Sequence, residues 1–285
     1  MKRIAVFAHY DENSKIRDYV VTYLKGLKEV AEKIIFVSDC YIDENELLKI
    51  KDYTDFSICL KHGEYDFGSY KRGFLCAQEN NLLTDCDELI FCNDSCYAPI
   101  FPFSEMFKQM EQKDIDFWGP IQNSGLSNTK THIQSFFLVF RPQVFNSDVF
   151  KNFINSIKRI PDKRQIIETY ECGTTKLLEN VGFKWDVYSD LSKTYNNAYL
   201  FLYKELIKKE KYCFLKRTIP NFKARIFVYK LKSFIEQNTQ YDYNLIQNDI
   251  NHCNPKISIS LFLVMFYKYV FKFRFCNKYK KEDSK

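Results

Sequence analysis

The first half of the chain alternates short apolar runs with segments whose apolar residues recur at helical spacing. In residues 15–32, for instance, Ile16, Val20, Leu24, Leu27 and Ala31 fall on one side of a helix. The pattern predicts strands over Arg3–Ala8, Lys33–Ser38, Asp55–Leu60 and Glu88–Cys92, and helices over Lys15–Glu32, Glu44–Ile50 and Ser69–Asn80. Such alternation is typical of a parallel α/β sheet, in which ligands bind beyond the carboxyl ends of the strands.

After about position 100 the pattern becomes less regular. It predicts helices over Pro102–Lys113, Ser147–Ile157 and Gln165–Asn180, a short strand over Asp116–Gly119 and a longer strand over His132–Arg141. From Ala198 to Gln237 the chain is expected to be helical, basic and aromatic. The sequence has no low-complexity linker and no internal repeat. We therefore expect an α/β domain with a mostly parallel sheet over residues 1–197, continued by a basic, aromatic helical extension over residues 198–285.

The segment Ile257–Phe275, near the end of the chain, is amphipathic. It is nearly all apolar as far as Phe266, but Lys268, Lys272 and Arg274 interrupt its second half. The uninterrupted stretch is shorter than the roughly 20 residues that a membrane-spanning helix needs. Basic residues on one face and Phe, Leu and Val on the other suit a helix that lies on a membrane surface, and suit equally a core-packing helix with a solvated face.

Composition narrows the class of protein. Hydrophobic residues make up 46% of the 285 residues and aromatic residues 17%, which indicates a globular chain. The net charge of +6 is too small for a nucleic-acid-binding protein without a concentrated basic patch, but basic residues cluster after about position 200 and favour an anionic surface there.

The cysteines and the start of the chain indicate the cellular compartment in which the protein is expected. The ten cysteines form no CxxC pair, so we expect neither a zinc site nor a disulfide framework. The opening MKRIAVFAHYDE has an apolar run too short for a signal peptide. We therefore expect a cytosolic protein with free thiols.

Three of the eight glycines lie in residues 61–73, directly after the third predicted strand. Glycine is used where the backbone turns sharply or approaches a ligand. Here Asp66 could accept hydrogen bonds from a ribose or a base, and Lys71 or Arg72 could meet phosphate charge. The alternative is an ordinary tight connection from strand to helix, with solvated charges.

Polar residues at the ends of two later strands are further candidates. Asn93 and Asp94 end the fourth strand, where they could hold a divalent cation that also binds substrate phosphates, or could simply cap the turn before Pro99. His132 and Gln134 share one face of a strand and could present polar groups to a sugar, although an isolated histidine is more often structural.

Glu171 lies in the segment YECGTTKLL, within or at the start of an amphipathic helix. A partly buried carboxylate in a cleft can act as a general base. The alternative is an exposed acidic residue that is favoured at the start of a helix by the helix dipole.

Taken together, these segments resemble the rhamnan synthesis protein F family of glycosyltransferases. The matching segments are FAHYDENSKI, EYDFGSYKRG, ELIFCNDSCYAPI, DFWG, HIQSFFLVFR, YECGTTKLL with Gly182-Phe183 after it, and the stretch from Asn197 through LYKELI to FLKR. The resemblance runs from about residue 3 to about residue 220, and the tail beyond about 235 matches nothing in it.

The resemblance implies a GT-A-like fold and sugar transfer from a nucleotide-diphosphate sugar onto a surface polysaccharide or a lipid-linked glycan. By analogy, the loop from His9 to Asp11 would face the nucleotide base. Glu171 would be the catalytic carboxylate, and Asp94 would stand in place of the Asp-x-Asp signature, which reads Asn-Asp-Ser here. The other implied contacts are Asp66, Gly68, Lys71 and Asn93 with the nucleotide sugar, and Asp116, Trp118 and Gln134 with the sugar or acceptor.

This chemistry needs a neutralised diphosphate leaving group and a base for the acceptor hydroxyl. Mg²⁺ or Mn²⁺ on Asp94, with help from Lys71, would supply the first. Glu171 or His132 would supply the second, and a single base implies inversion at the anomeric carbon. The sugar would be rhamnose or another deoxysugar, and the enzyme would work peripherally at the inner face of the cytoplasmic membrane.

Two alternatives stay open at this point. One is another nucleotide-dependent transferase, such as a methyltransferase, although no Gly-rich G-x-G turn follows the first strand. The other is a non-catalytic glycan-binding or assembly protein on a transferase fold. A non-catalytic protein differs from an enzyme in one observable way: its fold need not keep Asp66, Asp94, His132 and Glu171 around one site.

Overall fold

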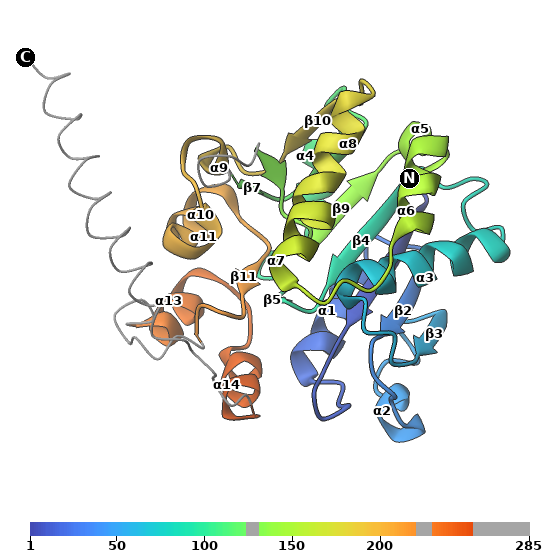
Figure 1. The fold of residues 1–285 in the computed structure, drawn as a ribbon. Helices are drawn as coiled ribbons and strands as arrows, with labels where there is room; N and C mark the ends of the chain where they lie inside the picture. Colours follow the sequence, from blue (N-terminus) through green and yellow to red (C-terminus); the bar gives the residue numbers. More distant parts are fainter. Residues whose placement is uncertain (124–130, 221–229, 253–285) are drawn as a thin grey trace, which may run out of the picture.

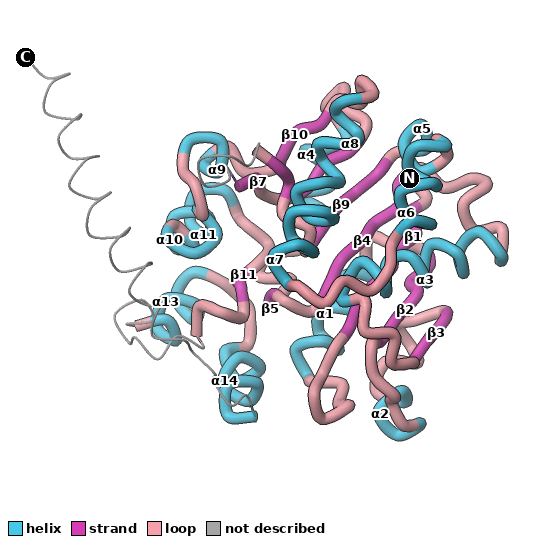
Figure 2. Tube along the Cα trace, in the orientation of Figure 1, coloured by secondary structure: helices cyan, strands magenta, loops and turns pink. Residues whose placement is uncertain are grey.

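A seven-stranded, mostly parallel sheet forms the centre of the molecule (Figures 1 and 2). The computed structural model describes residues 1–123, 131–220 and 230–252. The strand order is β10 (Trp185–Val187), β6 (Phe117–Gly119), β9 (Phe137–Phe140), β4 (Glu88–Asn93), β1 (Arg3–His9), β2 (Lys33–Ser38) and β3 (Phe56–Cys59). Within this described sheet β9 runs antiparallel to both neighbours, and the other pairings are parallel. The predicted α/β fold is confirmed.

Helices cover both faces of the sheet, so every residue of β1 is buried. Ile4, Val6 and Ala8 point to one face, where they pack with α3 (Tyr65–Glu79) and with the helices between residues 142 and 180. Ala5 and Phe7 point to the other face, where the covering helices are α1 (Asp18–Lys28) and α4 (Phe103–Glu111). A continuous apolar run such as β1 is what a strand buried on both faces requires.

The helices on the first face are α5 (Pro142–Phe145), α6 (Asp148–Ser156), α7 (Lys163–Ile166) and α8 (Cys172–Asn180). Figure 1 looks onto this face. Between α7 and α8 the chain makes a π-helical turn, η1 (Ile167–Glu171), so the predicted helix Gln165–Asn180 is present with one wider turn inside it. Such turns are rare in proteins, and those that occur frequently lie at functional sites.

The predicted strand His132–Arg141 is divided in two. β8 (His132–Ile133) pairs with β7 (Gln122–Asn123) in a small separate sheet, and β9 belongs to the central one. The backbone N–H of Gln134 donates to the carbonyl of Ile121 (3.0 Å), and the chain then turns at residues 135–136 into β9, which pairs with β4.

The continuous helix expected over Ala198–Gln237 is wrong. The described residues form α10 (Ala198–Phe201), α11 (Tyr203–Glu210), β11 (Leu215–Lys216) and α13 (Leu231–Asn238), followed by α14 (Tyr243–His252). Lys211, at φ +50°, ends α11, and β11 then pairs antiparallel with β5 (Cys96–Tyr97). Other short elements that the pattern did not predict are β5, β7, β10, α5 and α9 (Leu191–Thr194).

Residues after 197 pack into the same hydrophobic cluster as β1. Leu206, Phe214, Ile235 and Ile246 are buried there with Phe7. In Figure 1 their helices lie along one side of the sheet. The division of the chain at residue 197 stays a prediction, but the region beyond it shares the core of the α/β domain.

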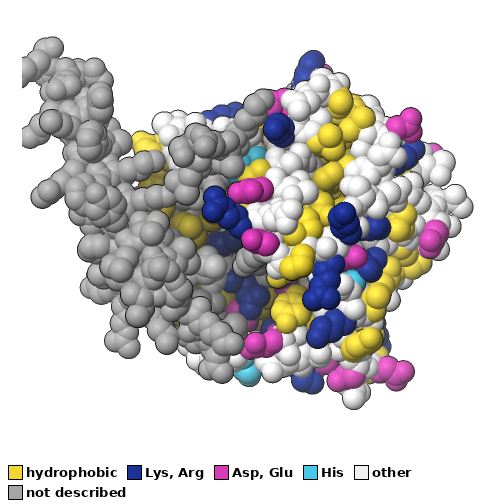
Figure 3. Space-filling view, viewed as in Figure 1, with side chains coloured by type: hydrophobic (Ala, Val, Ile, Leu, Met, Phe, Trp, Pro, Cys, Tyr) yellow, Lys and Arg dark blue, Asp and Glu magenta, His cyan; other side chains and the backbone are white. Residues whose placement is uncertain are grey.

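Within the described ranges, no helix combines the length and the apolar composition that crossing a bilayer would require. The segment Ile257–Phe275 lies outside the described residues, so both interpretations of it stay predictions. On the face shown in Figure 3, Lys and Arg side chains are interspersed with acidic ones.

Candidate active site

The candidate site lies where the sheet topology reverses. From β1 the chain continues to β2 on one side, and it later returns to β4 on the other side of β1. Ligands of open α/β sheets bind at such a switch point, beyond the carboxyl ends of the two strands. Here the backbone N–H of Tyr10, after β1, donates to Oδ2 of Asp94, after β4 (3.1 Å). Asp94 therefore lies at the position where a ligand is expected.

Asp94 is held by both its backbone and its side chain. Its N–H donates to the carbonyl of Ala8 (3.2 Å), and its own carbonyl accepts from the Tyr19 hydroxyl (3.2 Å) and from Arg217 (3.4 Å). Burial raises the pKa of Asp94 to about 6, although the positive charge of Arg217 opposes the rise. A carboxylate with a raised pKa favours a cation beside it.

Asp66, the second residue of α3, is part of the same site. Its Oδ2 accepts from Nδ2 of Asn93 (2.7 Å), and Oδ1 of Asn93 accepts from the hydroxyl of Ser95 (2.6 Å). Burial and the negative charge of Asp94 raise the pKa of Asp66 to about 7. The structure thus brings Asp66, Asn93 and Asp94 together.

Two cationic side chains enter this site from β11 and the residue after it. Nζ of Lys216 donates to the Ser95 hydroxyl (2.9 Å) and lies 4.4 Å from the centre of the Phe136 ring. The guanidinium of Arg217 lies 4.6 Å from the centre of the Tyr19 ring. Sequence reasoning gave neither residue a role, although both belong to the FLKR segment that resembles the family. That segment was the signal that could have identified them.

Glu171 lies on the other side of the site, at the end of the π-helical turn. Its Oε1 accepts from Nε2 of Gln134 (3.0 Å), and the same amide nitrogen lies 3.2 Å from Nε2 of His132. An amide nitrogen only donates, so the lone pair on Nε2 of His132 is used as an acceptor. Oε2 of Glu171 accepts no hydrogen bond from the described residues. Glu171 is therefore the better placed base of the two candidates.

Electrostatic effects join the two sides of the site. The negative charge of Glu171 contributes to the raised pKa of Asp66. It also adds to the effect of burial in raising the pKa of Tyr199, from α10. Asp66, Asp94, His132 and Glu171 thus belong to one neighbourhood, which is the arrangement that an inactive fold need not keep.

Three predicted contacts lie elsewhere. Nζ of Lys71 donates to the carbonyls of Asn155 and Ile157 (2.9 Å each) at the end of α6, so we no longer assign it to a phosphate. The Trp118 side chain is fully buried and donates to Glu88 (3.2 Å). Asp116 accepts from Gln143 and from the backbone of Lys184 (2.7 Å each), at the opposite end of β6. We therefore assign Trp118 and Asp116 structural roles and not acceptor contacts.

Three more candidates support the site without facing it directly. His9 is buried, its Nδ1 lies 2.9 Å from the Ser38 hydroxyl, and burial lowers its pKa to about 4, which keeps it neutral. Asp11 forms an ion pair with Arg17 (2.9 Å) that shapes the loop after β1. A Cβ on Gly68 would lie 2.3 Å from Cβ of Glu64, so this glycine allows a tight turn into α3. In the loop after β1 the exposed aromatic side chain is Tyr10.

The oxygen ligands at the site suit a hard divalent cation. Among the described residues, no group of three or more His, Cys, Asp or Glu side chains could hold a metal ion. Mg²⁺, however, usually binds through one or two carboxylates together with substrate phosphates. Asp66 and Asp94 fit that requirement.

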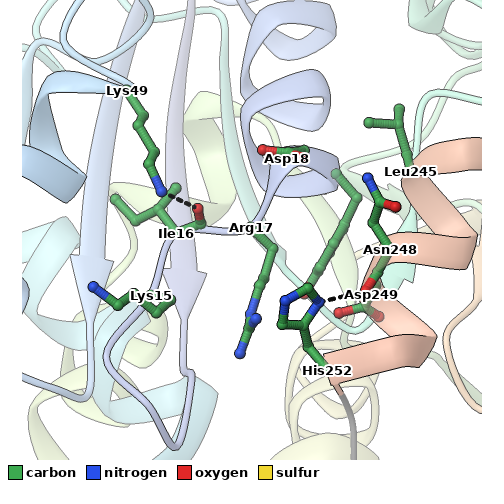
Figure 4. Close-up of a pocket in the computed structure, with 10 residues that line it drawn as sticks. Lys15, Ile16, Arg17, Asp18, Lys49, Leu245, Asn248, Asp249 and His252 are labelled. Atoms are coloured by element: carbon green, nitrogen blue, oxygen red, sulfur yellow. Dashed lines mark hydrogen bonds between the residues drawn. The ribbon is translucent and has the colours of Figure 1, made fainter.

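A cavity of about 350 Å³ adjoins the site between the start of α1 and α14 (Figure 4). Tyr19 and Asp249 belong both to its wall and to the contacts of Arg217. The rest of the lining comes from Lys15, Ile16, Arg17, Asp18, Lys49, Leu245, Asn248 and His252.

The family described as "Rhamnan synthesis protein F" matches residues 34–284. The chain belongs to this rhamnan synthesis protein F family. The family predicted from the sequence motifs is confirmed.

Two curated relatives match parts of the chain. The chain is 27% identical to "Virulence protein VirA" of Vibrio anguillarum over 198 residues, which cover 67% of this chain and 60% of the relative. It is 26% identical to "Uncharacterized protein y4gN" of Sinorhizobium fredii over 151 residues, which cover 53% of this chain and 39% of the relative. The chain thus matches less than two thirds of the length of either relative.

Similar solved structures include core-mannan synthase A from Aspergillus fumigatus in its Mn/GDP form and a cytidylyltransferase from Leptospira borgpetersenii. The first has 11% identity and a TM-score of 0.39 over 65% of this chain and 72% of its own. The second has 16% identity and a TM-score of 0.43 over 85% of this chain and 100% of its own.

Asp66→Asn is expected to stabilise the fold at neutral pH. The folded pKa of Asp66, about 7, exceeds the ordinary value of about 4, so the wild type loses stability as the pH rises between these values. The variant lacks this loss, so its unfolding free energy at pH 7.5 should exceed that of the wild type by on the order of 4 kcal/mol, and the gain should nearly vanish by pH 4. Urea unfolding from pH 4 to 8 measures the difference. Asp85→Asn, at an exposed position, is the matched control, and parallel curves for Asp66→Asn and the wild type would contradict the assignment.

Proposed function

We propose that the protein transfers a sugar from a nucleotide-diphosphate sugar onto a surface polysaccharide or a lipid-linked glycan. The observation that carries this proposal is the meeting, at the switch point of the sheet, of two buried carboxylates, a lysine and a carboxylate oxygen that accepts no hydrogen bond from the described residues. Family membership supports the same class of reaction.

The donor diphosphate would lie between the loop after β1 and β11. Lys216 would neutralise part of the charge that develops on the leaving diphosphate, and Arg217 adds positive potential beside it. Mg²⁺ or Mn²⁺, held by Asp94 and Asp66, would supply further charge neutralisation on the leaving group. The exposed ring of Tyr10 offers an aromatic surface for the nucleotide base at the same edge of the sheet.

Glu171 would take the proton of the acceptor hydroxyl through Oε2. Gln134 donates to Oε1 and so orients the carboxylate, while the Nε2 lone pair of His132 accepts from the same amide. Transfer with one base and no covalent intermediate inverts the anomeric carbon. Rhamnose or another deoxysugar is the proposed cargo, and a screen of nucleotide sugars for nucleotide release, with and without Mn²⁺, would identify it.

Glu171→Gln is expected to keep donor binding and to lose most turnover. The change preserves size and hydrogen bonding but removes the base, so kcat should fall by about 10²-fold or more. Initial-rate assays, with donor affinity measured separately, test this. His132→Asn is the comparison variant and should retain more activity, because His132 acts through Gln134. An active Glu171→Gln with an inactive His132→Asn would reverse the assignment of the base.

We also propose that the protein acts at the cytoplasmic face of the membrane, where the basic segment Ile257–Phe275 lies on anionic lipid. The support is its sequence, since each basic residue near such a surface contributes about 1 kcal/mol. The full chain should float with anionic liposomes, should be released by high salt and should not float with neutral ones. A chain ending at Asn254 should bind less, and so should the full chain with Lys268, Lys272 and Arg274 changed to Glu. Equal flotation of all three would favour a core-packing helix.

A further inference from the structure

A buried ion pair joins α14 to the candidate site. The side chain of Asp249 is 1% exposed, and both of its oxygens accept hydrogen bonds from Arg217: Oδ2 from Nε (2.9 Å) and Oδ1 from a terminal nitrogen (3.0 Å). Oδ2 also accepts from the Tyr97 hydroxyl (2.8 Å), which adjoins β11 through β5. A two-pronged pair of this kind fixes the plane of the guanidinium as well as its position.

The other terminal nitrogen of Arg217 reaches the site itself. It donates to the carbonyl of Asp94 (3.4 Å), which also accepts from the Tyr19 hydroxyl (3.2 Å). The guanidinium of Arg217 lies over the Tyr19 ring, so the two side chains that donate to this carbonyl also contact each other. The orientation of the Asp94 peptide, and so of its carboxylate, thus depends on contacts that Asp249 organises from α14.

Apolar contacts also hold α14 against the core. Ile246 of the same helix is fully buried in the core cluster, and Leu245 and Ile250 pack against that cluster. Compared with apolar side chains of similar volume, a buried ion pair contributes little net stability, because removing two charges from water offsets much of their attraction. Its presence beside Asp94 is better explained by the orientation it imposes. Figure 4 shows Asp249 on α14, opposite the start of α1.

We propose that Asp249 is a positioning residue for the transfer reaction: it holds Arg217 in the orientation that fixes Asp94 toward the donor diphosphate. The inference rests on the function proposed above and extends its site to α14. Asp249 acts through Arg217 and does not touch the substrate. The effect of removing it should therefore disappear once Arg217 can no longer form the pair.

A double-mutant cycle tests this dependence. Asp249→Asn preserves size but weakens the pair, and Arg217→Lys keeps the charge but loses the two-pronged geometry. We expect Asp249→Asn to lower kcat/KM for the donor by about 10²-fold, mostly through kcat, since small misplacements in a site have effects of that size. In the Arg217→Lys background the same change should cost less than about threefold, because coupled residues are not additive.

A matched control variant separates the positioning of Arg217 by Asp249 from the packing of α14 against the core. Ile246→Ala removes buried apolar contact from α14 without touching a polar atom, so it should lower the midpoint of thermal unfolding while folded molecules keep the wild-type kcat. Asp249→Asn removes the carboxylate charge beside buried Arg217 and should also lower that midpoint, but unlike Ile246→Ala it should lose kcat in molecules that are still folded. All variants are made in the full chain and assayed well below their unfolding midpoints.

Three results would overturn the inference alone: wild-type kcat/KM in Asp249→Asn, losses that multiply in the double variant, or an equal loss of kcat in Ile246→Ala. A different result marks failure of the proposed function. If the wild type neither transfers sugar from any donor tested nor binds a nucleoside diphosphate with Mn²⁺, that function is wrong, and the role of Asp249 falls with it.

Discussion

The rest of this structure depends on one constraint: the carboxylates of Asp66 and Asp94 are buried beyond the carboxyl ends of β1 and β4. Burial disfavours the ionised form of Asp66 and Asp94 and raises the pKa of both. Such groups are costly to the fold unless hydrogen bonds and opposite charge compensate them. Asn93 supplies a hydrogen bond, and Lys216 and Arg217 supply charge. A site that binds anions through a cation has use for carboxylates that are not fully compensated.

This constraint explains why the chain beyond residue 197 returns to the core. The cations must come from an element at the end of β4, and β11 provides it by pairing with β5. Phe214, just before β11, is buried against the rings of Tyr23, Phe103 and Phe137, which fixes the position of the strand. Lys216 and Arg217 then reach the site because Phe214 anchors the strand in the core. The region expected to be a helical extension is thus part of the candidate active site.

The sequence was most informative where local patterns decide the structure. Strand ends identified Asp94, and the alternation of side chains along a strand placed His132 and Gln134 on one face. The sequence was misleading where a role depends on the direction in which a side chain points. Lys71 is five residues after Asp66 in α3, and this spacing turns Lys71 by about 140° to another face of the helix. The sequence failed for Lys216, because a two-residue strand that pairs across more than a hundred positions leaves no periodic signal. The fold class therefore followed from hydrophobic periodicity, whereas the cationic side chains of the site depended on long-range pairing.

The central claim is that β11 completes a site for the diphosphate of a nucleotide sugar. The most direct test is equilibrium binding of a nucleoside diphosphate, with Mn²⁺ present, to the wild type and to Lys216→Met, which keeps most of the side chain and removes its charge. Charge-assisted contacts of this kind are worth about 1.5–3 kcal/mol, so the account predicts binding that is weaker by at least about tenfold, with an unchanged unfolding midpoint. Equal affinity of the two proteins would contradict it.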